Sequence, residues 1–397
     1  MILTKTVLST YSADTFGVCS ALYELGGLVV MHDASGCNST YNTHDEPRWY
    51  TMDSMVFISG VTEKDILFGS DKKLIDDVCT AAEENHPSFI ALCGSPLPLA
   101  TGTDFRAAAK IIEQRTGIPA FGFPTNGMNT YLTGAGMAFE AIARCVRAED
   151  GSVNRSKKVR AGRPKVNLLG VTPLDFSVVG NAEAMRKVFS RNGLTVRSTW
   201  AMGEKLPSVL TSGDADVNLA VSAAGFKAAK VLKERFGIPY IAGVPAGDAE
   251  SKLLARRLLA AAEGTAEPDT ETGAEAGPDG SCDFLLIGEP VFISSVKEEL
   301  QRSYGMKKVR CICPMPDAPR ELTAGMEIMI YEPEIRDAMN KAEHVLADPF
   351  YARLIPDTAG KFISLPHEAY SGRYYRKDIP LFIGAGLNDW LKLQAGL

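Results

Sequence analysis

The sequence lacks the long apolar runs that mark membrane proteins. No stretch of the 397 residues approaches 18 consecutive apolar side chains, and the first 16 residues contain no apolar core followed by a small-residue cleavage site. A membrane span and a secretion signal are therefore not expected. An excess of basic residues is missing too, because 42 Lys and Arg stand against 48 Asp and Glu, a formal net charge of −6. We expect a cytoplasmic protein that binds neither nucleic acid nor membranes.

The loops that commonly bind nucleotides are also absent. No G-x-G-x-x-G opens a helix after an apolar strand, and no G-x-x-x-x-G-K-[ST] loop occurs. The chain itself is therefore expected to bind no nucleotide. Its eight cysteines include no CxxC pair, and in a reducing compartment such cysteines serve as metal ligands or buried thiols more often than as disulfides.

What the sequence does contain is typical of a folded α/β protein. Hydrophobic residues make up 45% and charged residues 23% of the chain, and short apolar runs alternate with helical stretches throughout. We expect three Rossmann-like domains, each a mostly parallel sheet flanked by helices. The expected divisions are residues 1–161, residues 162–262, an acidic flexible linker or loop at 263–281, and residues 282–397 with a C-terminal helix.

The first two domains share a short signature. Gly-Ile-Pro occurs at residues 117–119 and again at 237–239, each time between a helical stretch and an apolar run. Glycine ends a helix readily and proline cannot continue it. The repetition predicts that these two domains are structural relatives.

Three early cysteines stand near the ends of apolar runs that lead into loops rich in Gly, Ser or Pro. They are Cys19, Cys37 and Cys93. Because such loops hold ligands in open α/β sheets, we expect the three thiols to converge, as the ligands of an iron-sulfur cluster would. Their spacing matches no compact metal motif, and three separately buried thiols are the alternative.

The order of these segments resembles the nitrogenase component-one superfamily, which includes the MoFe-protein subunits, their cofactor-assembly scaffold, and the tetrapyrrole reductases of chlorophyll and coenzyme F430 synthesis. The resemblance rests on Cys19, on HDASGC ending at Cys37, on TEKDILFGSDKKL at 62–74, and on LCGSPLPLATGTD around Cys93. It extends to GKFISLPHEAYSGRYY at 360–375, which is similar to the family's late His segment. It therefore spans nearly the whole chain.

The resemblance implies that Cys19, Cys37 and Cys93 hold a cluster at a subunit interface, either a 4Fe-4S cluster or one like the nitrogenase P-cluster. Three thiolates leave a cubane one ligand short. The fourth ligand would come from a partner subunit or from Asp33, since a carboxylate completes the cluster in one tetrapyrrole-reductase branch. Asp33 is otherwise interpreted as a loop acid or helix cap.

The family's remaining metal ligands are matched only in part. The segment similar to the second-domain cysteine region contains Ser222 and no cysteine, so no FeMo-type cofactor is expected. His367 falls where the family has its histidine, with a one-residue difference in spacing, and would be a proton donor or a ligand to a substrate metal. A hydrogen-bonded core or interface histidine is the alternative. Arg373 and Arg376 would clamp the carboxylates of an acidic substrate, or are surface charges.

The other Cys and His residues have weaker interpretations. Cys282, Cys311 and Cys313 allow a second metal site, with buried thiols as the alternative, and Cys79 and Cys145 are expected to be core or flank thiols of helices. His32 is placed to tune the cluster by hydrogen bonding, whereas His44 is expected on the surface.

Together these features predict an oxidoreductase, the catalytic component of a two-component reductase. An ATP-dependent iron protein would pass low-potential electrons through the interface cluster to a small-molecule substrate in the interdomain cavity, with a metallated tetrapyrrole as the implied substrate class. The chain would pair with itself or with a sister component-one subunit. One alternative is a scaffold for assembly of a metal cluster or cofactor without substrate turnover. The other is a metal-free protein that binds a ligand in its cleft.

Overall fold

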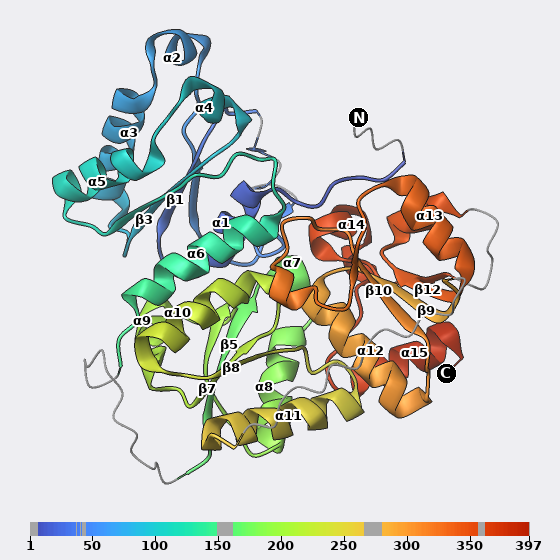
Figure 1. Ribbon diagram of the computed structural model, residues 1–397. Coiled ribbons are helices and arrows are strands. Elements are labelled where there is room, and N and C mark those ends of the chain that lie inside the picture. The colour runs from blue at the N-terminus through green and yellow to red at the C-terminus, as the bar shows by residue number, and fades with distance from the viewer. Residues whose placement is uncertain are drawn as a thin grey trace.

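The structure, a computed structural model, describes residues 7–36, 38, 39, 41, 45–148, 162–265, 280–355 and 362–396. In these ranges the chain forms three successive parallel sheets with helices against them, called here the first, second and third units (Figure 1). The predicted α/β fold with three Rossmann-like sheets is confirmed. The exact divisions stay a prediction, because much of both junctions lies outside the described residues. None of the described helices has the length and apolar composition needed to cross a membrane.

The first unit has a four-stranded sheet in the order β2-β1-β3-β4, with all neighbouring strands parallel. Both central strands, β1 and β3, are buried at every position, as continuous apolar runs predict for parallel strands. The strands are β1 (Leu28–His32), β2 (Met55–Ile58), β3 (Ile90–Gly94) and β4 (Ala120–Phe123). The helices are α1 (Asp14–Leu22), α2 (Glu63–Phe68), α3 (Asp71–Asn85), α4 (Pro96–Thr101), α5 (Phe105–Thr116) and α6 (Tyr131–Cys145).

The second unit repeats this strand order as β6-β5-β7-β8. Gly117 and Gly237 end α5 and α10 in the left-handed conformation, with φ of 70° and 66°, so the predicted kinship of the two units is borne out by both topology and helix ends. The strands are β5 (Lys165–Val171), β6 (Thr195–Ala201), β7 (Val217–Ala220) and β8 (Tyr240–Ala242). The helices are α7 (Pro173–Phe176), α8 (Asn181–Arg191), α9 (Leu206–Leu210), α10 (Phe226–Phe236) and α11 (Asp248–Glu263).

The third unit has five strands in the order β11-β10-β9-β12-β13, a doubly wound arrangement. The predicted C-terminal helix is present as α15. The strands are β9 (Cys282–Ile287), β10 (Val309–Cys313), β11 (Glu327–Ile328), β12 (Ala342–Ala347) and β13 (Phe362–Ser364). The helices are α12 (Pro290–Tyr304), α13 (Glu332–Lys341), α14 (Glu368–Tyr375) and α15 (Ala385–Ala395), with a 3-10 helix, η5 (Pro349–Leu354), after β12.

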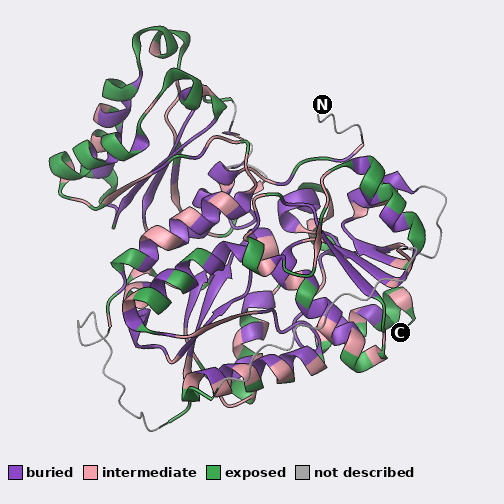
Figure 2. Ribbon diagram, in the orientation of Figure 1, coloured by how far each residue is buried: buried purple, intermediate pink, exposed green. Residues whose placement is uncertain are grey.

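Buried side chains continue from one unit into the next. One hydrophobic cluster includes residues of all three units, and a second joins the second and third units. Figure 2 shows buried residues along the sheets and on the helices between them, with the most exposed helices on the outer side of the first unit. The three sheets therefore share apolar cores.

Helices α1 and α6 cross at a backbone-to-backbone contact made by two glycines. A Cβ atom on Gly17 would lie 2.1 Å from the Tyr131 carbonyl oxygen, and one on Gly134 would lie 1.7 Å from the Asp14 carbonyl oxygen. Only glycine permits such an approach. The crossing fixes α1, and with it Cys19, against the first sheet.

The segment from residue 7 to residue 12, called here the N-terminal arm, connects the first unit to the third. The backbone N–H groups of Val7 and Leu8 donate to Oε1 of Glu332 at 2.9 and 2.8 Å. Ser12 donates its N–H to the Ala369 carbonyl at 2.7 Å. The arm thereby positions Tyr11 between the two units.

Candidate functional site

The first candidate site lies where the strand order of the first sheet reverses, between β1 and β3. Ligands of open α/β sheets bind outside the carboxyl ends of the strands at such a point. Cys93 is the penultimate residue of β3. Cys19 was expected near a loop but lies inside α1, because the helix continues to Leu22 before the chain turns. Cys37 lies outside the described residues.

Cys19 and Cys93 are both fully buried, and their thiols are near enough to interact electrostatically. The Cys93 thiol also donates to the Val30 carbonyl at 3.6 Å. Burial raises the pKa of the Cys19 thiol well above its usual value, and Cys93 and Glu46 raise it further. Such a thiol releases its proton to a metal ion more readily than to water. The described residues contain no group of three or more side chains arranged to hold a metal. Among them, two of the three predicted cluster ligands are present, and the third, Cys37, lies outside the described residues.

A buried ion network lies beside this thiol pair. Arg48 donates from Nε to Oε1 of Glu46 at 2.6 Å and from Nη1 to Oε1 of Glu24 at 3.0 Å. Its Nη2 donates to the carbonyl of Ser20, the residue after Cys19, at 2.9 Å. Arg48 therefore ties α1 to the segment around Glu46.

Asp33 and His32, at the end of β1, are both engaged by neighbouring groups. Oδ1 of Asp33 accepts from the Ala34 N–H at 2.8 Å, and Oδ2 accepts from Nδ2 of Asn38 at 2.7 Å. The nitrogens of His32 lie 2.8 and 2.9 Å from the hydroxyls of Ser59 and Ser70, and burial lowers the pKa of this imidazole. These contacts suit a loop acid and a loop-anchoring histidine, and a ligand role for Asp33 stays a prediction.

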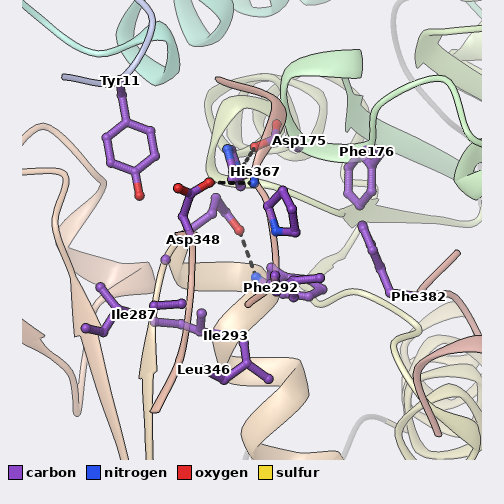
Figure 3. A pocket seen from close by; sticks show the side chains of 15 residues that line it. Tyr11, Asp175, Phe176, Ile287, Phe292, Ile293, Leu346, Asp348, His367 and Phe382 are labelled. Carbon is purple, nitrogen blue, oxygen red and sulfur yellow. Dashed lines mark hydrogen bonds and ion pairs between the residues drawn. The ribbon is translucent and has the colours of Figure 1, made fainter. Parts of the chain in front are cut away.

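The second candidate site is a small space that we call the inner cavity. It is lined by side chains that follow β5, β9, β12 and β13, so the carboxyl ends of the second and third sheets converge there (Figure 3). Its volume is about 30 Å³, which is room for about one water molecule. The polar side chains that line it are Tyr11, Asp175, Glu289, Asp348 and His367.

His367 points into the inner cavity with one ring nitrogen unpaired. Nδ1 is buried and has no hydrogen-bond partner among the described residues, whereas Nε2 lies 3.7 Å from Oδ1 of Asp175. The Asp175 carboxylate also accepts from the hydroxyls of Tyr131 and Thr172, the latter at 2.9 Å. The backbone N–H of His367 donates to Oδ2 of Asp348 at 2.9 Å. The unpaired Nδ1 is therefore available to form a hydrogen bond with a water or ligand in the cavity.

Glu289 is a further ionisable group at this point and, like Asp175 and Asp348, was missed in the sequence. Burial raises its pKa to about 8, and the nearby charge of Asp175 raises it too, although Oε1 accepts from the Ala223 N–H and Oε2 from the Phe292 N–H, both at 2.8 Å. Burial therefore favours the protonated form of this carboxyl. Its position directly after the apolar run of β9, and that of Asp175 shortly after β5, was the signal available in the sequence.

Ser222, in the position expected for a cofactor-binding cysteine, is turned toward the backbone. Its hydroxyl donates to the Gly170 carbonyl at 2.9 Å, and it is not among the residues that line the inner cavity. The buried Glu289 carboxyl bonds to the next residue, Ala223. This arrangement does not fit a FeMo-type cofactor.

A larger space, the outer groove, lies between the first and third units and measures about 870 Å³. Tyr11 and Phe16 of the N-terminal region and Tyr370 of α14 contribute to its walls. Arg373 lies here in a bidentate ion pair with Asp45, at 2.8 and 2.7 Å. His367 and Arg373, both predicted to act on substrate, thus face different spaces, since His367 lines the inner cavity and Arg373 the groove. Arg376 pairs with Glu368 at 2.8 Å.

The remaining cysteines of the described ranges form no common site. Cys311 packs in one hydrophobic cluster, whereas Cys282 and Cys313 pack in the other. Burial raises the pKa of Cys311 and of Cys313 to about 12. Cys79 is half-buried and Cys145 is exposed. His44 lies outside the described residues.

Comparison with known proteins was made at the level of sequence and of structure. The family model for nitrogenase component 1 type oxidoreductases matches residues 15–337. A nitrogenase iron-molybdenum cofactor biosynthesis protein NifE from Methanosarcina barkeri is 26% identical over 211 residues, which cover 51% of this chain and 44% of that protein. The nitrogenase molybdenum-iron protein alpha chain from Clostridium pasteurianum is 28% identical over 190 residues, 47% of this chain and 33% of that one. A light-independent protochlorophyllide reductase chain from Leptolyngbya boryana is 24% identical over 196 residues, 48% and 38% of the two chains.

The matched region spans less than half the length of each of these relatives. A solved structure described as nitrogenase Cp1 at pH 5 superimposes with a TM-score of 0.60 at 18% identity, covering 94% of this chain and 86% of that one, which supports the fold. Since the family model covers most of the sequence, this chain belongs to the nitrogenase component 1 type oxidoreductase family.

Proposed function

We propose that this protein is the catalytic, electron-accepting component of a two-component reductase. The observation that carries the proposal is the burial of two interacting thiols, Cys19 and Cys93, near the reversal point of the first sheet. Family membership and an interior acid cluster at the ends of the other two sheets support it.

The proposed cofactor is an iron-sulfur cluster, 4Fe-4S or P-cluster-like, held by Cys19, Cys37 and Cys93 at a subunit interface. Thiolate is the ligand that such iron prefers, and two adjacent buried thiols fit this donor set. When bound, the cluster would accept and release single electrons at low potential. The buried Arg48 network would hold the strands of chain around it.

The proposed substrate site is the outer groove and not the inner cavity. The inner cavity admits only about one water molecule, whereas the outer groove, at about 870 Å³, is within the usual range for a ligand of drug or cofactor size. Phe16 lines the groove from the same helix that carries Cys19. Arg373 on the groove wall would bind an acidic substrate such as a metallated tetrapyrrole by exchanging the Asp45 carboxylate for one of the substrate. The proposed partners are a second copy or sister subunit and an ATP-dependent iron protein.

Anaerobic reconstitution tests the cofactor. Protein incubated with iron and sulfide should develop a broad visible absorption band and bind about four iron atoms per cluster. The Cys19→Ala, Cys37→Ala and Cys93→Ala variants should lose the band. Cys145→Ala, which changes an exposed thiol, should keep it. An unchanged spectrum in the three variants would refute the ligand assignment.

A second candidate function is a scaffold for cofactor assembly. The observation that favours it is Ser222 in place of a fixed cysteine ligand, since transient holding needs no such ligand, and NifE proteins are among the relatives. The two functions differ in turnover. A reductase oxidises its iron protein in step with product formation, whereas a scaffold transfers a preformed cluster to an acceptor protein.

A further inference from the structure

One residue, Asp45, joins the outer groove to the buried Arg48 network. Its carboxylate accepts from Nε and Nη2 of Arg373 at 2.8 and 2.7 Å, and both residues line the groove. Its carbonyl oxygen accepts from Nη2 of Arg376, directly after α14, at 3.4 Å. Two arginines therefore hold this point of the first unit against the third.

The ion pair between Asp45 and Arg373 can exchange with a ligand. The Asp45 side chain is 19% exposed and that of Arg373 is 45% exposed, and ion pairs at such positions change an equilibrium by about fivefold at most. A ligand carboxylate in the groove can form the same two parallel hydrogen bonds with the guanidinium. Replacement of Asp45 by such a ligand therefore costs little.

The residues that follow Asp45 form a fixed, buried turn. Glu46 is fully buried, and its Oε1 accepts from Nε of Arg48 at 2.6 Å while its Oε2 accepts from the Tyr41 hydroxyl at 2.8 Å. The Trp49 N–H donates to the Glu46 carbonyl at 3.2 Å. Because these bonds hold the turn together, a shift of Asp45 reaches Arg48.

This turn and the groove both contact α1. Nη2 of Arg48 donates to the Ser20 carbonyl at 2.9 Å, and Ser20 directly follows Cys19. The ring of Tyr41 stacks on that of Phe16 with 5.0 Å between centroids, and Phe16 lines the groove. The contacts that begin at the groove therefore end on the helix that carries Cys19.

We infer that Arg373 binds a ligand carboxylate in exchange for Asp45, and that this exchange loosens the packing of α1 around Cys19. The ligand class is a small molecule with a carboxylate group. Coupling between two sites is reciprocal, so a change that fixes α1 more firmly weakens carboxylate binding by the same factor.

The use of this site by a substrate rests on the proposed function, because the outer groove is the proposed substrate site. The exchange and its effect on α1 require neither a cluster nor a partner protein. Both can therefore be tested in the metal-free whole chain, where failure would leave the cluster ligands untouched.

A ligand titration tests the carboxylate site. The probe is a metal-free porphyrin with two propionate groups, and its dimethyl ester is the matched control ligand. Arg373→Gln should weaken binding of the acid about tenfold, because charge-assisted hydrogen bonds are lost. Asp45→Asn should strengthen it by about two- to fivefold, because the internal competitor loses its charge. Neither variant should change binding of the ester. An acid that does not bind, or that binds Arg373→Gln as well as wild type, would overturn the site.

Thiol labelling tests the coupling to α1. N-ethylmaleimide reaches a buried thiol only when local opening exposes it, and mass spectrometry of peptides follows each cysteine separately. Cys19 should be labelled about two- to fivefold faster in Asp45→Asn without probe, and in wild type saturated with the acid, than in wild type alone. Cys311, which is buried in the cluster shared by the second and third units, should be labelled at an unchanged rate.

The control variant is Asp77→Asn, which breaks an exposed ion pair with Lys73 and should change neither binding nor labelling. Equal acceleration at Cys19 and Cys311 would show global destabilisation and overturn the coupling. So would a labelling rate of Cys19 that stays the same in the variant and with the acid. Failure of the wild-type chain to take up iron and sulfide would instead overturn the proposed cofactor, and would leave both of these measurements valid.

Discussion

At the scale of single residues, two buried glutamates make the stability of this protein depend on pH. Burial raises the pKa of Glu250 and of Glu289 to about 8, from an ordinary value of 4.5. Between these two pH values the native state holds protons that the unfolded chain has released. Their contribution to stability is therefore complete below pH 4.5 and is lost as the pH rises through 8.

Glu250 allows this dependence to be tested away from the candidate sites. Its Oε2 has no hydrogen-bond partner among the described residues, and Glu298 adds repulsion. We predict that Glu250→Gln raises the free energy of unfolding at pH 9 by about 2 to 4 kcal/mol relative to wild type, and by much less at pH 5. Urea unfolding of both proteins at the two pH values measures the difference. Equal effects at pH 5 and pH 9 would show that Glu250 is not protonated in the native state.

Arg48 supplies a second prediction at this scale. Arg48→Ala should lower the free energy of unfolding by about 3 to 5 kcal/mol, because it leaves the carboxylates of Glu46 and Glu24 buried without a counter-charge. The control is Arg115→Ala, which breaks a half-exposed ion pair with Asp76 and should cost less than about 1 kcal/mol. Denaturant titration of the metal-free variants measures both. Similar losses would mean that the Arg48 network is solvated.

The residues of the candidate sites were predictable to different degrees. Cys93 and His367 stand next to recognisable strand ends, so their placement at the carboxyl edge of a sheet follows from the apolar pattern. The proximity of Cys19 to Cys93 does not follow from the apolar pattern, because it depends on the packing of α1 on α6. Glu289 was missed because a single acid after a strand is common, and only the fold reveals that it faces Asp175.

At the scale of secondary-structure elements, the α1–α6 crossing is the contact on which the position of Cys19 depends. Gly134→Ala should lower the free energy of unfolding by about 3 kcal/mol or more, since its Cβ would lie 1.7 Å from a backbone oxygen that cannot move aside. Gly136→Ala in the same helix is the matched control. Its Cβ would meet nothing closer than 3.5 Å among the described residues, so it should be neutral or slightly stabilising. Thermal unfolding of the two variants separates the effect of the close α1–α6 contact from the general preference of alanine for helices.

The elements themselves were largely predictable. Continuous apolar runs such as those of β1, β3 and β9 identify buried parallel strands, and the Gly-Ile-Pro repeats mark the ends of α5 and α10. The apolar run around Cys19 was not assigned between strand and helix, because periodicity alone cannot separate short buried segments of the two kinds. Strand order and the shared cores depend on contacts between distant segments, which no local pattern encodes.

At the scale of the whole molecule, polar contacts join the first and third units, and Asp317 makes several of them. Its carboxylate accepts from the N–H and hydroxyl of Thr130 and from the hydroxyl of Thr133, at 2.6 to 3.0 Å, at the start of α6. We predict that Asp317→Ala speeds amide hydrogen exchange in the first turn of α6 and in the N-terminal arm by about five- to thirtyfold. This factor corresponds to a decrease of about 1 to 2 kcal/mol in the free energy of local opening.

Mass spectrometry of the exchanging peptides measures this change. The control is Asp337→Ala, which removes an exposed ion pair with Lys341 on α13 and should leave exchange in the first unit unchanged. Faster exchange throughout the protein in Asp317→Ala would indicate global destabilisation and not a local opening between units.

The N-terminal arm also sets a condition on biosynthesis. Ser12 must pair with Ala369, which lies 357 residues further along the chain. At ordinary elongation speeds the ribosome needs about 20 to 70 s to cover that interval. The arm therefore waits, without its partner, while the second and third units are being synthesised, and Tyr11 can take its place only after α14 has left the ribosome.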